Sequence, residues 1–140
     1  MILIGDELIT ALKTVSFSAT KVKVTDAYSV STPTFPMITL DELPSNDGVY
    51  LDNQPEIVRN IFTVEAYAHN MTVRGNPMSK RAVAMLMISE ADKFLNETYG
   101  LTMSGNVIAV PYSDTSVFRA AANYFAYIDT RTNLIYRGIN

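Results

Sequence analysis

Only a few side chains in this sequence could carry acid–base chemistry. His69 is the only histidine, and the chain has no cysteine. In a Ser-His-Asp site the histidine is the base that activates the serine, so His69 would have to serve there. No Gly-x-Ser-x-Gly segment, a common setting for a nucleophilic serine, is present. Because His69 ends an alternating segment on its more polar side, a surface histidine at a strand end is the simpler interpretation.

The carboxylates are not spaced as metal ligands. Asp41 and Glu42 are neighbours in an alternating segment, where successive side chains point to opposite faces of a strand. Glu90 and Asp92 lie about 200° apart around a helix of 3.6 residues per turn. With one histidine and no cysteine, we expect no zinc or iron site and no cofactor.

The segment 76–80, Asn-Pro-Met-Ser-Lys, could hold an anion, because it places the N–H groups of a helix N-terminus beside a lysine. A phosphate-binding loop also needs clustered glycines, whereas the six glycines here are scattered. We therefore interpret the segment as helix capping, with Asn76 as the N-cap and Pro77 in the first helical position.

Composition indicates one domain, residues 1–140, in which hydrophobic residues make up 48%. The net charge is −3 and the eleven lysines and arginines are scattered, whereas nucleic-acid-binding proteins usually carry a basic patch.

The N-terminus carries acids and no basic stretch, unlike a secretory signal, and no apolar run is long enough to span a membrane. The lack of cysteine fits folding in a reducing cytoplasm. Charged residues make up only 18%, which suggests a surface partly covered by other protein or simply a neutral one.

The spacing of apolar residues predicts helices over Ile2–Val15 and from Pro77 to about Thr98, with Gly100 as a C-terminal cap. Strands are predicted over 20–28, 37–43, 57–69, 101–112 and 116–129, with a short returning strand over 134–136 and an interruption at 104–106. The natural α+β architecture is a largely antiparallel sheet of about four to five strands with two helices packed on one face.

The long strand near the C-terminus has two distinct sides. One parity carries Phe118, Tyr124 and Ile128, which we expect to be buried. The other carries Arg119, Asn123, Tyr127 and Asp129, and it faces either solvent or another subunit.

Residues 44–54 are predicted to form a loop, because Pro-Ser-Asn-Asp-Gly supplies turn residues. The loop is longer than most connections in compact domains. Val49, Tyr50 and Leu51 lie in its middle, so they either dock onto a partner or fold back on the core.

Three segments together resemble one protein family. The first is 35–43, Phe-Pro-Met-Ile-Thr-Leu-Asp-Glu-Leu. The second is the strand 61–68, followed by a long helix entered through Asn-Pro-Met-Ser-Lys-Arg-Ala at 76–82. The third is the ending 117–137. Their order and content resemble the tail-terminator proteins, also called tail-completion or head–tail joining proteins, of long-tailed bacteriophages.

The resemblance implies a structural protein and not an enzyme. Proteins of this family form a ring, typically a hexamer, that caps the finished tail tube, stops its polymerisation and presents a surface to the head connector or stopper protein. Expected partners are further copies of the chain, the tail tube protein and the connector, with genome DNA only passing through the ring and no membrane contact. The expected location is the virion tail or neck, after assembly in the bacterial cytoplasm. A neck adaptor or minor capsid component is the alternative, and a small hydrolase or ligand-binding domain is the alternative from another class.

The resemblance implies that contacts lie in loops, strand edges and the C-terminal tail. The aromatic side chains of Tyr124, Phe125 and Tyr127, together with the strongly apolar second helix, could also supply an interface. The candidate interface residues with subunits or tube are therefore Asp47, Val49, Tyr50, Leu51, Arg74, Arg119, Tyr127 and Arg137.

Overall fold

The computed structural model describes residues 4–26, 33–51, 54–129, 132 and 134–136; the side chains of 44–51, 54–56 and 136 lie outside that description. The chain folds into two helices and eight strands within these residues. In chain order these are α1 (Gly5–Leu12), β1 (Lys23–Asp26), β2 (Met37–Leu51), β3 (Gln54–Ala68), β4 (Met71–Val73), β5 (Asn76–Met78), α2 (Lys80–Tyr99), β6 (Thr102–Val110), β7 (Phe118–Asp129) and β8 (Leu134–Tyr136). Neither helix is long and apolar enough to cross a membrane.

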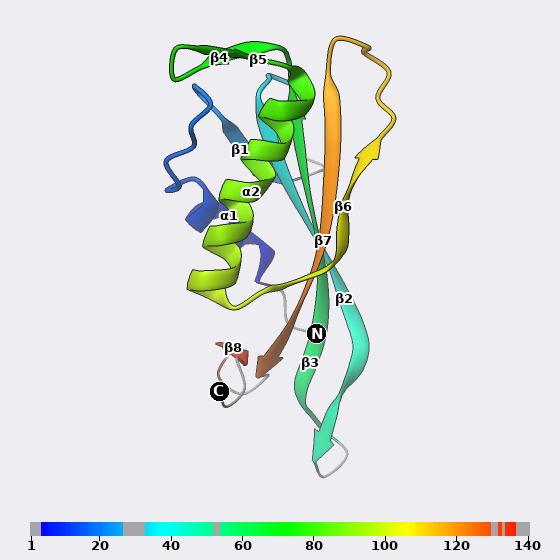
Figure 1. The fold of residues 1–140 in the computed structure, drawn as a ribbon. Coiled ribbons are helices and arrows are strands. Elements are labelled where there is room, and N and C mark those ends of the chain that lie inside the picture. The colour runs from blue at the N-terminus through cyan, green and yellow to red at the C-terminus, as the bar shows by residue number, and fades with distance from the viewer. Residues whose placement is uncertain (1–3, 27–32, 52–53, 130–131, 133, 137–140) are drawn as a thin grey trace.

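The main sheet has the strand order β1-β2-β3-β7-β6, and β8 pairs with the end of β7. The β1–β2 pair is parallel and the other pairs are antiparallel. The predicted α+β class and largely antiparallel sheet are therefore confirmed. Figure 1 shows a strongly twisted sheet in which the β2–β3 hairpin continues well past the helices, and a separate two-stranded arm, β4–β5, at the opposite end.

The core is built from one parity of the central strands. In the β3–β7 ladder Phe62 pairs with Tyr124 and Val64 with Ala122, so these even-numbered side chains share a face. They are at most 1% exposed and join one cluster with Leu12 of α1. Burying a large apolar side chain contributes about 1.5–3 kcal/mol, so this alternation is the main local cause of the sheet. The burial of Tyr124 and Ile128 confirms the predicted parity of β7.

Two polar side chains on that buried face hold the start of α1. The Glu42 carboxylate accepts hydrogen bonds from the backbone N–H of Ile4 at 3.0 Å and of Gly5 at 2.6 Å, and a carboxylate at a helix N-terminus is favourable. The side-chain amide of Asn60, which is 1% exposed, donates to the same carboxylate at 2.8 Å. A Cβ on residue 5 would lie 2.9 Å from Glu42 Oε1, so glycine permits this close approach.

The start of α2 differs from the prediction. Asn76 and Pro77 belong to β5, which pairs with β4, and the N-cap is Ser79, whose Oγ accepts from the Ala82 N–H at 3.2 Å. An Asn-Pro pair fits an extended segment as well as a helix start, because proline fixes φ at a value common to both. The predicted C-terminal cap is confirmed, since Gly100 has a φ of 73°.

Other helix and strand boundaries also differ from those predicted from the sequence. Helix α1 covers 5–12 and not the predicted 2–15. The predicted loop at 44–54 is wrong, because β2 continues to Leu51 and pairs with β3 through two register shifts. These shifts let strand pairing continue past turn-forming residues. The predicted interruption of the sixth strand is confirmed by a register shift between Ser104 and Ile108, with Gly105 at a φ of 77°.

Candidate functional site

The face of the sheet formed by the odd-numbered residues of β3 and β7 carries a group of apolar side chains outside the main core. Leu43 pairs with Ile61, and Ile61 pairs with Phe125, so these three form a row across β2, β3 and β7. Leu43 is 63% exposed and Tyr127 is 41% exposed. We call Leu43, Ile61, Ile108, Phe125 and Tyr127 the outer patch.

Two residues of the outer patch, Ile61 and Phe125, line a hollow of about 320 Å³. Next to the row, the Thr63 hydroxyl donates to the Asn123 Oδ1 at 2.9 Å. The rings of Phe125 and Tyr127 meet edge to face with centroids 6.0 Å apart. The hollow is lined by Arg59, Ile61, Ser104, Asn123, Tyr124 and Phe125. Aromatic and aliphatic side chains beside hydrogen-bonding groups are typical of a protein-binding surface.

The other end of the same face is closed by aromatic side chains. The rings of Tyr67, Phe35 and Tyr112 all contact one another, with centroids 6.2 Å (Tyr67–Phe35), 5.4 Å (Tyr67–Tyr112) and 6.0 Å (Phe35–Tyr112) apart. Arg119 pairs with Glu65 and places its guanidinium 5.5 Å from the Tyr67 ring centroid. The hydrogen bond to Glu65 raises the pKa of Arg119, and burial raises the pKa of Tyr67. Arg119 therefore contacts neighbouring residues of its own sheet, Glu65 and Tyr67.

His69 does lie close to a serine and an aspartate, but their order is wrong for catalysis. The Ser116 hydroxyl donates to the Asp114 Oδ1 at 2.7 Å, and the Ser116 N–H donates to the same oxygen at 2.9 Å. These two bonds lower the pKa of Asp114. His69 Nδ1 is 3.5 Å from the Ser116 Oγ, so serine, not histidine, bridges the group. A serine that gives its proton to a carboxylate is not activated by the histidine, and the cluster acts as a turn.

The helix N-terminus considered above for an anion is already satisfied by side chains. Asn70 Oδ1 accepts from the Lys80 N–H at 2.7 Å, and Ser79 caps Ala82. The Lys80 ammonium donates to the Thr115 carbonyl. Among the described residues, no three histidine, cysteine, aspartate or glutamate side chains come together as a metal site.

The structure separates the candidate interface residues into different regions. Residues 47 and 49–51, predicted as Asp47, Val49, Tyr50 and Leu51, lie in the far part of β2, and their side chains are outside the described ones. Arg74 is exposed at the tip of the β4–β5 arm with a φ of 51°. Arg119 and Tyr127 share the odd side of β7, and residue 137, predicted as Arg137, lies outside the described residues.

Some sequence-based interface candidates proved to be core. Tyr124 is 1% exposed and donates its hydroxyl to Asp92 at 2.8 Å. The apolar stripe of α2 is likewise buried in its own fold, through residues such as Met87 and Leu95. Leu43 and Ile61 were missed, because their partners across the sheet depend on register; their odd positions in alternating segments were the only signal available.

Comparison with known proteins does not assign the chain to a family. The chain matches no family model and no curated protein.

Proposed function

We propose that this chain is a structural subunit of a bacteriophage tail, one copy in a ring that caps the tail tube, stops its growth and joins it to the head. The observation that carries the proposal is the outer patch. Leu43, Ile108 and Tyr127 are between 41% and 63% exposed, and they lie on the face opposite the buried side chains of the same sheet. Large apolar groups grouped on one face mark a surface that another protein covers.

The β2–β3 hairpin supports the same role. Each strand has 15 residues, which is about 50 Å of extended chain. In Figure 1 the backbone of the hairpin extends beyond both helices. A projecting hairpin of this length suits contact with a second subunit or with the tube.

The proposal takes both helices to cover the same side of the sheet, which leaves the outer patch free for partners. In support, buried residues of α1 and α2, such as Leu8 and Met87, belong to one cluster with Phe62 and Tyr124. The proposed partners are further copies of the chain, most simply six in a ring, the tail tube protein and the head connector.

The direct test combines the purified chain with assembled tail tubes. Electron microscopy should show added density on one end of each tube and no further growth when tube subunits are supplied. The variant Phe125→Ser, which places a polar group in the outer patch, should lose this capping while keeping its circular dichroism spectrum. Tubes that continue to grow in the presence of the wild-type chain would contradict the proposal.

Phage particles made without this protein separate the two structural roles. Over-long tails are expected for a tail terminator. Normal tails that fail to join heads would instead assign the chain to the neck, as an adaptor.

A further inference from the structure

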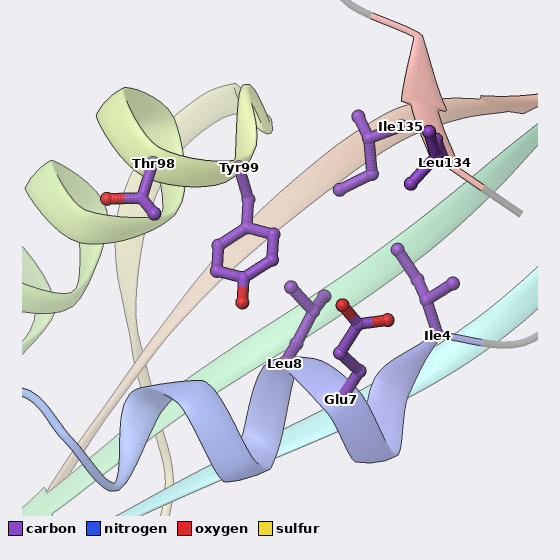
Figure 2. A pocket seen from close by; sticks show the side chains of 7 residues that line it. All are labelled: Ile4, Glu7, Leu8, Thr98, Tyr99, Leu134 and Ile135. Atoms are coloured by element: carbon purple, nitrogen blue, oxygen red, sulfur yellow. The ribbon is translucent and has the colours of Figure 1, made fainter.

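A groove lies where the start of α1, the end of α2 and β8 meet. It has a volume of about 460 Å³. In Figure 2 the Tyr99 ring points from the end of α2 toward Leu8 of α1, and the Glu7 carboxylate lies between Leu8 and Ile4. The lining residues are Ile4, Glu7, Leu8, Thr98, Tyr99, Leu134 and Ile135. A carboxylate beside an aromatic ring and aliphatic walls suits a guanidinium group with an apolar stem.

The charges on α2 are placed against the helix dipole. Its first turn carries Lys80 and Arg81 and no acid, and its last turn carries Glu97 and no base. A helix is stabilised by the opposite arrangement. Arg81 and Glu97 are both exposed, and their placement against the dipole weakens the helix slightly. A contact at each end with an opposite charge would explain this polarity.

The basic end of α2 adjoins the β4–β5 arm. Arg74 at the arm's tip is exposed, and it forms no hydrogen bond or ion pair with another described residue. Pro77, on the next strand of the arm, is also exposed. The arm end therefore presents Arg74 and Arg81, while the groove end presents Glu7 and Glu97. The two ends are separated by the length of α2, roughly 30 Å for a helix of this size.

We propose that the groove receives the β4–β5 arm of a second copy of this chain, with the Arg74 guanidinium against the Glu7 carboxylate. Arg81 then faces the acidic last turn of α2 in that copy. The contact joins different surfaces of the two copies, so repetition closes a ring if the rotation per copy allows it. The inference rests on the proposed function in that it names the contact between ring subunits, and it leaves the outer patch to the tail tube protein.

The test is a charge exchange in the full-length chain, followed by sedimentation velocity and native mass spectrometry. One variant carries Arg74→Glu and Arg81→Glu, and the other carries Glu7→Arg and Glu97→Arg. The wild-type chain should self-associate, and each variant alone should associate at least about tenfold more weakly. An equimolar mixture should recover assembly with the two variants alternating, because every contact then joins opposite charges again. The matched control, Lys21→Glu with Lys23→Glu, changes two exposed lysines outside α2 and the β4–β5 arm and should assemble like wild type.

A folding defect cannot imitate this result, because a misfolded variant would not be rescued by mixing. Arg81→Glu and Glu97→Arg should each stabilise α2, because they place an acid at its N-terminus and a base at its C-terminus. A wild-type chain that stays monomeric at every concentration, or variants that assemble alone as wild type does, would overturn the inference. Assembly that follows the expected pattern without capping tail tubes would keep the inference and overturn the tail function. If each variant alone still capped tail tubes, the tail function would be kept and the inferred contact between copies would be overturned.

Discussion

The two faces of the β3–β7 pair come from the same strands but differ in how far their side chains are buried. On the even side, Phe62 and Tyr124 are paired and buried, and they share one cluster with residues of both helices. On the odd side, Ile61 and Phe125 are paired in the same way and remain partly exposed. Pairing across a sheet therefore does not decide burial; what packs on each face does. The even face holds the main core, and the part of the odd face that carries the outer patch is partly exposed.

Truncating one phenylalanine on each face gives the sharpest contrast. Phe62→Ala should lower the free energy of unfolding by about 3–5 kcal/mol, because it leaves a cavity in the core. Phe125→Ala should lower it by less than about 1 kcal/mol. Urea unfolding of both variants measures the difference. Equal losses would show that the odd face is as much a part of the core as the even face.

Removing one tyrosine hydroxyl from each face tests the polar contacts. Tyr124→Phe deletes the hydrogen bond to Asp92 and should cost about 1–3 kcal/mol, because Asp92 then lacks that donor. Tyr127→Phe, at a 41% exposed position, should change the stability by a few tenths of a kcal/mol at most. Thermal unfolding at pH 7 compares them, and a larger loss for Tyr127→Phe would reverse the assignment of the faces.

The same pair predicts a difference at alkaline pH. Burial, and then the hydrogen bond to Asp92, raise the pKa of Tyr124. An unfolded tyrosine loses its proton near pH 10, so above this pH the folded state binds more protons than the unfolded state. Stability should be complete below about pH 10 and should fall as the pH rises further. Tyr124→Phe should flatten this fall between about pH 9 and 11, whereas Tyr127→Phe should keep it. Tyr67, whose pKa burial also raises, should leave some slope in the first variant.

The smallest expected effect concerns the ion pair on the odd face. The side chains of Arg119 and Glu65 are 29% and 12% exposed, so solvent screens their attraction in part. Arg119→Ala should therefore cost less than about 1 kcal/mol. The control Lys93→Ala, at an exposed helix position, should be neutral within about 0.5 kcal/mol. This end of the odd face carries a small buried cluster of Met37, Tyr67 and Val117. A loss from Arg119→Ala as large as that from Phe62→Ala would show that the cluster depends on the ion pair.

The candidate surface was only partly visible in the sequence. Tyr127 and Phe125 stood out as aromatic residues on a strand, but Tyr124 looked equally suitable until it proved to be buried. Leu43 and Ile61 could not be joined to them, because residues 18 positions apart meet only through the register of β2 and β3. The group around His69 shows the converse case. Its residue types are those of a Ser-His-Asp site, but the Ser116 hydroxyl donates to Asp114 and not to His69, so the three are not arranged as such a site.

Local side-chain patterns by themselves determined the α+β class, the parity of β7, the interruption at Gly105 and the cap at Gly100. These features depend on neighbouring residues alone, since alternation and positive φ are properties of a short segment. Tertiary structure decided that β2 continues past Pro44, that Asn76 and Pro77 form an arm, and that Asn60 is buried. Each of these needs a partner distant in sequence: β3 for the far part of β2, β4 for the arm, and the Glu42 carboxylate for Asn60.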